Sequence, residues 1–357
     1  MKKIVSIVVV ILLTLTLFAG CGAQNAGTAS ADESAAATTA QSAASEESTA
    51  QSGTSDEALN IVYLAPSKDI QYWQWVEAGV KQACEEIGAN LVTYDAQNSV
   101  SSQQNNCNTA ITQEVDGIVL SPVSSPSCTP VLDAAEAAGI PVTIAAIGPD
   151  EGVENYACLV TADDYTSGYE NGLFLCEKVL AAGGGTIGVL SLPLDRSNAQ
   201  QKMAGLEKAC EEKGIEICQV LQTQDLTVNT ATQQANDLMT ANPDMKGIYG
   251  MYEQAGIGAV AAVETSGAAD NYTIVSSDGS PESIAMIREG KIAGIVVQEA
   301  VGQGLVATQE LIKAIKGEEI TEKNIPLPEP LVTTENVDDP DIQEILKLVY
   351  PASAGSY

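Results

Sequence analysis

The sequence predicts an α/β fold with two lobes, each built on a doubly wound parallel sheet. Short apolar runs alternate with helical stretches of about 12–18 residues, the pattern of parallel strands joined by right-handed crossovers. Several runs, such as residues 118–120 and 295–297, are continuously apolar, as expected for strands covered by helices on both faces. Ten such runs are too many for one compact sheet, and the pattern restarts near residues 163–164, so two lobes are expected.

Two periodicities predict the individual elements. The helical stretches carry an apolar residue every three or four positions, and the first contains Trp73, Val76, Val80, Cys84 and Ile87. Glycines that follow helical stretches are typical of C-caps, and these are Gly88, Gly139, Gly214 and Gly290. Strands are expected at residues 60–65, 90–94, 117–121, 141–145, 157–160, 186–191, 215–221, 247–251, 272–276 and 292–297.

Residues 1–21 have the layout of a secretory signal. Lys2 and Lys3 precede an apolar run at residues 4–18, which ends in small residues before Cys21. This run is shorter than the about 20 apolar residues that a stable membrane span needs. The ending Phe-Ala-Gly-Cys resembles a bacterial lipobox, in which the signal is cut before the cysteine and the thiol receives lipid. We expect a lipoprotein signal peptide at residues 1–20 and a lipid anchor on Cys21 at the outer side of the cell membrane, with ordinary secretion as the alternative.

The lipidated Cys21 and a disordered linker are expected to make up residues 21–57. Residues 22–57 contain no aromatic and no branched aliphatic side chain, so they cannot bury enough apolar surface to offset chain entropy. A flexible chain of this length has a root-mean-square reach of roughly 30–35 Å. Such a tether lets the folded body sample the surface around a membrane complex.

The composition excludes several classes of function. The net charge of −31 argues against nucleic acid, because binding phosphates requires clustered Lys or Arg. The chain has no His, which excludes a His-based catalytic triad. The Gly-Gly-Gly run at residues 183–185 precedes a strand instead of opening a helix, so it does not cradle phosphate. We therefore do not expect an enzyme.

The cysteines do not indicate a metal site. Seven follow Cys21, no C-x-x-C is present, and an odd number cannot all pair within one chain. Buried free thiols are expected, and a pair between Cys107 and Cys128 stays open. The chain also has no D-x-[DN]-x-[DN]-G calcium loop, so no metal and no cofactor are expected.

Ligands of parallel α/β sheets bind beyond the carboxyl ends of the strands. Two such edges facing each other would form a cleft between the lobes. The segments directly after the predicted strands are therefore the candidates for binding, at residues 66–73, 121–124, 146–149, 163–165, 193–202, 252–254, 278–280 and 298–299.

Several stretches of the chain resemble one protein family. They are residues 61–64 with Tyr72, Trp73 and Gly79, residues 116–122 (Asp-Gly-Ile-Val-Leu-Ser-Pro), 138–142 (Ala-Gly-Ile-Pro-Val), 277–279 (Ser-Asp-Gly) and 294–298 (Gly-Ile-Val-Val-Gln). In this order and spacing, over residues 58–335, they resemble ribose-type periplasmic binding proteins, the sugar receptors of ABC importers.

The resemblance implies two lobes, three chain crossings that form a hinge, and closure around one ligand. It implies a first lobe at residues 58–162 and 299–325. The second lobe would comprise residues 163–298 and 326–345, with a tail strand near 330–336, and residues 346–357 would be a tail. The hinge is expected near residues 162–163 and 298–299.

By the same resemblance, Tyr72 and Trp73 fall where the family stacks aromatic rings on a sugar. Stacking works because one face of a sugar ring presents C–H groups to a flat apolar surface. The alternative is that Trp73 is only a core residue of the helix and does not stack on the ligand. Asp278 and Gln298 match positions that bind hydroxyls, although Asp278 could also be a simple turn residue before Gly279.

Four further residues lie at or next to binding positions of the family but differ from it in residue type. Lys202 falls at a family Arg position, and Glu253 follows Tyr252, which falls at a family Asn position. Ser121 lies where the family often has Asn. The candidate ligand-binding residues are thus Tyr72, Trp73, Ser121, Lys202, Tyr252, Glu253, Asp278 and Gln298.

At two places the sequence differs from the family in a way that affects which ligand is expected. Ala146 and Ile147 replace the family's Asp-Arg pair after the fourth strand, and Leu226 replaces an aromatic residue. A deoxysugar, a sugar derivative, a nucleoside-like compound or a furanosyl signalling molecule is therefore expected more than ribose.

The resemblance implies a monomeric solute-binding lipoprotein that delivers a sugar-like molecule to ABC permease subunits. The alternative is a sensory protein that presents its ligand to a chemoreceptor or histidine kinase.

Overall fold

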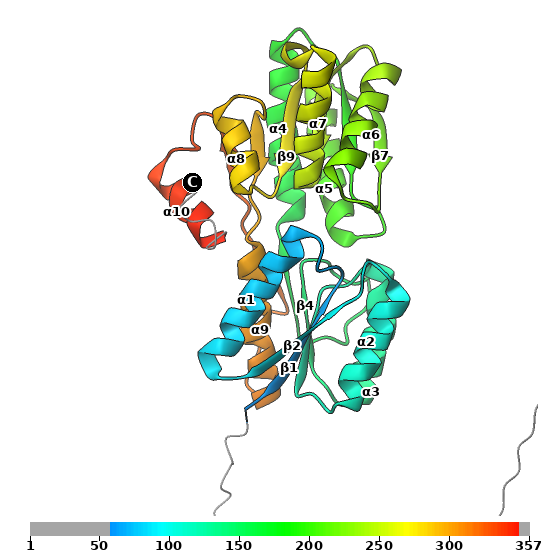
Figure 1. The fold of residues 1–357 in the computed structure, drawn as a ribbon, viewed down its shortest axis with the longest axis vertical. Helices are drawn as coiled ribbons and strands as arrows, with labels where there is room; N and C mark the ends of the chain where they lie inside the picture. Colours follow the sequence, from blue (N-terminus) through cyan, green and yellow to red (C-terminus); the bar gives the residue numbers. More distant parts are fainter. Residues whose placement is uncertain (1–57, 350–357) are drawn as a thin grey trace, which may run out of the picture. The chain divides into compact units, whose positions relative to one another are not determined.

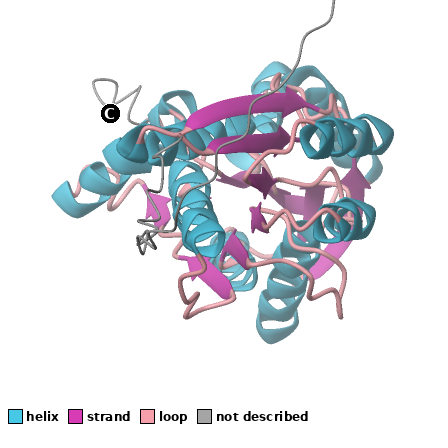
Figure 2. Ribbon diagram, turned by 90° about the horizontal axis from the view of Figure 1, so that it is seen from below, coloured by secondary structure: helices cyan, strands magenta, loops and turns pink. Residues whose placement is uncertain are grey.

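The computed structural model describes residues 58–349, and within this range the chain forms two six-stranded sheets with helices packed around them (Figures 1 and 2). The two parallel-sheet lobes confirm the predicted fold class. The predictions for the signal peptide, Cys21 and the linker lie outside the described residues. No helix among residues 58–349 is long and apolar enough to cross a membrane.

The first sheet is entirely parallel, with the strand order β11-β5-β4-β3-β1-β2. Its strands are β1 (Asn60–Ala65), β2 (Asn90–Asp95), β3 (Gly117–Leu120), β4 (Val142–Ala145), β5 (Cys158–Ala162) and β11 (Asn324–Leu327). Its helices are α1 (Gln71–Ile87), α2 (Val100–Thr112), α3 (Cys128–Ala137) and α9 (Ala300–Lys316).

Alternation along β1 shows how this sheet is covered on both faces. Ile61 and Tyr63 belong to the core cluster that includes α1 and α9, whereas Val62 and Leu64 belong to the cluster that includes α2 and α3. All four side chains are at most 1% exposed. Successive strand residues point to opposite faces, so a continuously apolar strand needs a helix layer on each side. Figure 1 shows these two helix pairs on either side of the sheet.

The second sheet has the order β12-β10-β9-β8-β6-β7 and is parallel except for β12, which runs antiparallel to β10. Its strands are β6 (Thr186–Ser191), β7 (Glu216–Gln222), β8 (Met245–Gly250), β9 (Thr273–Ser277), β10 (Gly294–Val296) and β12 (Leu331–Thr333). The helices of this lobe are α4 (Asp164–Ala181), α5 (Ser197–Lys213), α6 (Val228–Ala241), α7 (Glu253–Ser266) and α8 (Pro281–Arg288), and α10 (Pro340–Val349) follows.

The chain crosses between the sheets three times. It leaves β5 at residue 163 to enter α4, leaves β10 at residues 297–299 to enter α9, and leaves β11 at residues 328–330 to enter β12. The third crossing lies later than the sequence indicates. Since Leu327 pairs with Ala162, the first sheet extends two residues beyond the expected boundary at 325.

The ten predicted strands are all present, with ends that differ by at most two residues. β11 is an additional edge strand, and its Pro326 is compatible with an edge because proline cannot donate a ladder hydrogen bond. The predicted start of the C-terminal tail at residue 346 is too early, because Leu346 and Val349 are buried residues of α10. The cysteines of the described residues are free, and six of the seven are buried, so the open alternative of a Cys107–Cys128 bond is wrong here.

Helices α4 and α5 approach each other unusually closely. A Cβ atom on Gly205 would lie 2.2 Å from the carbonyl oxygen of Tyr165, and one on Gly168 would lie 2.2 Å from that of Lys202. Neither distance is compatible with a side chain unless the helices move apart. This packing brings the residues at the start of α4 next to α5.

Gly205→Ala should therefore destabilise the protein although alanine favours helix. We expect a loss of about 1–3 kcal/mol or more, because the methyl group collides with backbone atoms, against a propensity gain of at most about 1 kcal/mol. Urea unfolding would measure it. Gln201→Ala on the exposed side of α5 is the control and should stay within about 0.5 kcal/mol. Equal stabilities of the two variants would contradict the close packing.

Candidate functional site

A pocket lies where strands of both sheets end. Its lining residues all come from the segments that follow β1, β6, β7, β8, β9 and β10, so both lobes contribute. This is the edge at which open parallel α/β sheets bind ligands. The pocket is lined by Ile70, Tyr72, Trp73, Leu192, Arg196, Asn198, Leu226, Met251, Tyr252, Gln254, Asp278 and Gln298.

The pocket is narrow. The volume that the centre of a water molecule can occupy is about 40 Å³, enough for a few waters at roughly 10–15 Å³ each. A ligand of sugar size needs more room than this. Binding of such a ligand therefore requires the lining side chains or the two lobes to move apart.

Aromatic and apolar side chains form much of the wall. The rings of Tyr72 and Trp73 meet edge to face, with centroids 4.9 Å apart and planes at 88°. Trp73 is 5% exposed and Tyr252 is 4% exposed. Trp73 also packs within the hydrophobic core while it lines the pocket, and its stacking on a ligand stays a prediction. These flat surfaces suit the C–H face of a ring-shaped ligand.

A hydrogen-bonded chain connects the aromatic wall with the second lobe. The hydroxyl of Tyr72 lies 2.7 Å from Oε1 of Gln303 and 3.1 Å from Oε1 of Gln298, and Nε2 of Gln298 donates to Oδ1 of Asp278 over 2.7 Å. The backbone N–H of Glu253 donates to the other carboxylate oxygen of Asp278 over 3.1 Å. Tyr72 belongs to α1 of the first lobe and Asp278 follows β9 of the second, so this chain bridges the cleft.

Asp278 is placed in an unusual environment. Its φ of 81° is in the left-handed region, which a non-glycine residue adopts only when its surroundings hold it there. Burial raises the pKa of Asp278 to about 7, and the nearby charge of Glu253 adds to this effect. A buried carboxyl with two well-placed acceptor oxygens can exchange its present partners for ligand hydroxyls.

Arg196, Asn198 and Gln254 line the pocket but are not among the eight predicted residues, although they lie in the candidate segments 193–202 and 252–254. Arg196 is 2% exposed, its Nε is buried without a hydrogen-bond acceptor among residues 58–349, and the adjacent Asp195 is the carboxylate whose charge acts on it. Burial lowers the pKa of its guanidinium. A buried guanidinium with an unsatisfied nitrogen is costly unless a ligand supplies the acceptor. Arg196 is one of two arginines in the chain and stands directly after a strand-end loop, a signal that could have identified it.

Lys202 was expected in the binding site, but the structure places it elsewhere. Its Nζ lies 2.5 Å from Asp164 and 3.3 Å from Glu329, and its side chain is fully buried. Burial by itself would lower the pKa of Lys202, but the two carboxylates outweigh it and the pKa is raised. Asp164 opens α4 after the first crossing and Glu329 lies in the third, so Lys202 holds the hinge together.

Glu253 and Ser121 do not line the pocket either. Oε1 of Glu253 accepts hydrogen bonds from the backbone N–H of Ser280 and the hydroxyl of Ser283, both 3.0 Å away. Burial raises the pKa of Glu253. The hydroxyl of Ser121 accepts from Tyr63 within the first lobe. Of the eight predicted residues, the structure brings together Tyr72, Trp73, Tyr252, Asp278 and Gln298.

The lobes are also joined beside the pocket. The backbone N–H of Ser197 donates to Oγ of Ser125, and the N–H of Gly148 donates to Oγ of Ser197, each over 2.8 Å. Ala146 and Ile147, which replace the family's Asp-Arg pair, are buried and do not line the pocket. The loop after β4 thus contacts the opposite lobe through Gly148 and offers no charged side chain to a ligand.

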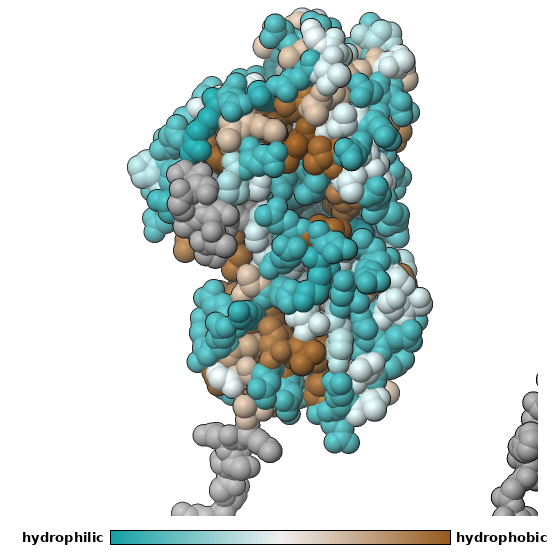
Figure 3. Space-filling view, in the orientation of Figure 1, coloured by the Kyte–Doolittle hydropathy of each residue, from teal (hydrophilic) through white to brown (hydrophobic). Residues whose placement is uncertain are grey.

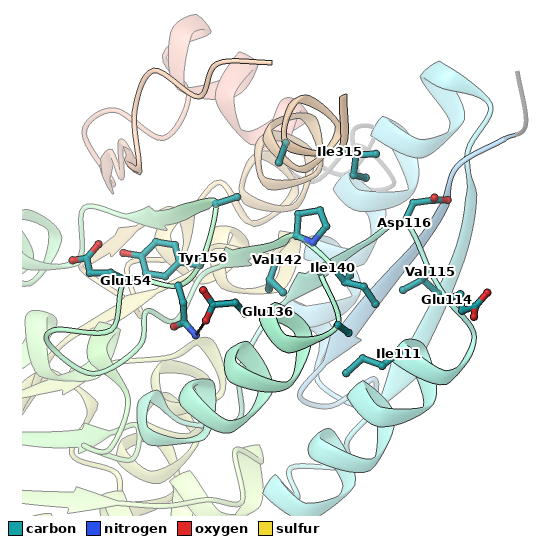
Figure 4. Close-up of a pocket in the computed structure, with 16 residues that line it drawn as sticks. Ile111, Glu114, Val115, Asp116, Glu136, Ile140, Val142, Glu154, Tyr156 and Ile315 are labelled. Atoms are coloured by element: carbon teal, nitrogen blue, oxygen red, sulfur yellow. Dashed lines mark hydrogen bonds between the residues drawn. The ribbon is translucent and has the colours of Figure 1, made fainter. Parts of the chain in front are cut away.

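A larger hollow of about 970 Å³ lies at the opposite edge of the first sheet (Figure 4). It is formed by residues that precede β3, β4 and β5 and by the ends of α2, α3 and α9. Four of its side chains are carboxylates, and Glu136 accepts a hydrogen bond from Asn155. Because this edge carries the amino ends of the strands, the hollow is not the expected ligand site.

The raised pKa of Asp278 predicts a pH dependence of stability. Between about pH 4 and pH 7 the folded state keeps the proton of Asp278 while the unfolded state has lost it, so the free energy of unfolding falls as the pH rises. The full effect is at most about 4 kcal/mol. Asp278→Asn should make the melting temperature less dependent on pH over this range. Asp237→Asn, at an exposed position of α6, should leave the dependence unchanged; the same slope in both variants would contradict the prediction.

The sequence matches the family described as periplasmic binding protein domain over residues 61–319. The ribose import binding protein of Bacillus subtilis (strain 168) is 23% identical over 258 residues, which cover 72% of this chain and 82% of that protein. A putative rhizopine-binding protein of Rhizobium meliloti is 29% identical over 261 residues, covering 70% and 82%.

A solved structure shares the fold. It is a carbohydrate transporter solute-binding protein from Agrobacterium radiobacter in complex with D-arabinose, with a TM-score of 0.76, 22% identity and coverage of 82% of this chain and 100% of that one. Proteins of this kind bind solutes outside the cytoplasm and are not enzymes. Because the family match spans well over half of the 357 residues, the chain belongs to the periplasmic binding protein domain family.

Proposed function

We propose that this protein is a lipid-anchored receptor that captures a sugar or sugar-like molecule between its lobes and delivers it to an ABC permease. The observation that carries the proposal is the composition of the pocket. Aromatic faces lie beside an Asp–Gln pair with exchangeable hydrogen bonds and a guanidinium whose Nε has no acceptor among the described residues. This combination of flat apolar surface with few, well-placed polar groups is what recognises a polyhydroxylated ring.

Each polar group has a distinct role in the proposed complex. The planar fork of Arg196 donates to neighbouring hydroxyl oxygens. Asp278 accepts hydrogen bonds from ligand hydroxyls. Gln298 can both donate to and accept from ligand hydroxyls, because its amide carries a donor and an acceptor. Trp73, Tyr72 and Tyr252 cover the apolar faces of the ring. The relatives that are named for ribose import and for a carbohydrate complex support this class of ligand.

Closure follows from contacts on both sides of the cleft. A ligand shifts the equilibrium toward the closed form only by its additional affinity for that form, so it must touch both lobes. Tyr72 and Trp73 come from the first lobe, while Arg196 and Asp278 come from the second. The closed form then offers one combined surface to the permease. Cys21 would keep the receptor near it, as the lipobox-like ending of the signal indicates.

A melting-temperature screen of the purified full-length protein tests the function. Sugars, deoxysugars, polyols and nucleosides are compared as single additions. A ligand at 100 times its Kd stabilises by about 2.7 kcal/mol, so a shift of several degrees is expected for the true class. No shift with any sugar or polyol, together with a shift for another class, would reject the sugar assignment.

Arg196→Met separates ligand binding from folding. We expect the affinity for the sugar found in the screen to fall by about 10–100-fold, because charge-assisted hydrogen bonds are lost. The stability of the free protein should stay the same or rise, since a buried cation with an unsatisfied Nε is removed.

Lys202→Met is the matched control, because it removes the other buried cation near the start of α5. It leaves Asp164 and Glu329 buried without their partner, so stability should fall by about 3–5 kcal/mol. Isothermal titration calorimetry and urea unfolding measure both variants. If Arg196→Met destabilised as strongly as Lys202→Met while binding was retained, Arg196 would be a structural residue.

A further inference from the structure

A second, larger space continues from the binding pocket. This groove has a volume of about 800 Å³ and is lined by residues of both lobes. Ile70, Leu226 and Gln254 line the pocket and the groove alike, so the two spaces are adjacent. A ring held in the pocket could therefore carry a substituent into the groove.

The side chains of the groove suit neutral hydroxyl groups. Five of them are amides, and each amide offers a donor and an acceptor. The remaining polar residues are Ser67, Thr227 and the carboxylates Asp69 and Asp225, and the lining contains no Lys or Arg. A phosphate or carboxylate would meet only like charge here. The amides are Gln71, Gln97 and Asn98 of the first lobe and Gln224 and Gln254 of the second.

The wall of the first lobe is held in a strained conformation. Gln97 and Asn98 have φ values of 51° and 56°, so two successive non-glycine residues are left-handed. Asp95 stabilises this turn, because its Oδ1 accepts from the backbone N–H groups of Gln97 over 2.8 Å and Lys68 over 3.2 Å. The N–H of Asn98 donates to the carbonyl of Pro66 over 2.7 Å. Backbone strain that the surroundings enforce is concentrated at binding sites.

The side-chain oxygen of Asn98 is buried and accepts no hydrogen bond from the part of the chain that the structure describes. A buried acceptor without a donor is uncommon and needs a partner from outside the fold. A hydroxyl of a bound molecule would supply that donor.

The opposite wall is also ordered. Thr227 caps helix α6 by accepting from the N–H of Thr230, and Oδ2 of Asp225 accepts from the hydroxyl of Thr230 over 2.8 Å. The second lobe thus presents Gln224 next to a fixed turn. The groove is lined by both lobes, so a group bound in it also favours closure.

We propose that the ligand consists of two linked sugar units, one held in the aromatic pocket and the second in the amide-lined groove. This inference rests on the proposed function. The second unit hydrogen-bonds to Asn98 and to the facing amide of Gln224. The ligand class is accordingly a disaccharide, with no charged group on the second unit.

Calorimetry on the full-length protein tests this inference with paired probes. D-Glucose, D-galactose and L-arabinose are compared with maltose, cellobiose, lactose, melibiose and arabinobiose. We expect at least one disaccharide to bind 10-fold or more tightly than either of its monosaccharides.

The double variant Asn98→Gly with Gln224→Ala shows where the second unit binds. Glycine keeps the left-handed backbone while removing the amide. The affinity for the disaccharide should fall about 10-fold, while the affinity for its monosaccharide should change less than 2-fold. Gln233→Ala, an exposed amide on α6, is the control and should change neither.

The outcomes separate the two proposals. If a monosaccharide binds as tightly as every disaccharide that contains it, or if the double variant keeps the disaccharide affinity, the two-unit ligand is refuted and the sugar receptor stands. If no sugar of either kind binds, the proposed function itself fails.

Discussion

One ammonium group ties together two of the three chain crossings between the lobes. Lys202 of α5 lies between Asp164, directly after the first crossing, and Glu329, within the third. In a fully buried setting these charges are strongly coupled, and none can be removed without leaving another unsatisfied. The contact depends on the close approach of α4 and α5, which only glycine at positions 168 and 205 permits. The position of the lobes, and hence the shape of the pocket, rests on this arrangement.

The charged group of the pocket differs from that of the hinge, because the protein supplies no hydrogen-bond acceptor for its Nε among residues 58–349. Arg196 precedes α5, six residues before Lys202, and lines the pocket. Arg196 is the N-cap of α5 with an extended backbone, whereas Lys202 lies inside the helix, so the two side chains leave the chain in different directions. Lys202 is paired with carboxylates inside the protein, whereas in the proposed complex the ligand supplies the acceptors for Arg196. In a chain of net charge −31, with a mostly hydrophilic face in Figure 3, these two buried cations stand out as specific features.

Much of the fold could be predicted from the sequence, because buried parallel strands are continuously apolar and their helices keep a regular apolar spacing. Strand β11 was not predicted, because its four residues, Asn-Ile-Pro-Leu, form a short, half-exposed edge strand without a clear apolar pattern. Five of the eight candidate site residues meet in the pocket, because side chains after parallel strands converge at one edge. Lys202, predicted to line the site, contacts Asp164 and Glu329 instead, and Arg196, which was not among the predicted residues, lines the pocket. The direction of each side chain depends on where α5 begins, and a sequence pattern fixes that start only to within a few residues.

Helix α1 begins at the pocket and contains both tryptophans of the chain, Trp73 and Trp75. Trp73 lines the pocket while Trp75, two residues on, is 9% exposed and packs in the core. The indole emission of the protein therefore comes from the wall of this pocket and from a core residue two positions further along the same helix. A molecule that enters the pocket would change the surroundings of Trp73, so its binding could be followed by intrinsic fluorescence without attaching a label.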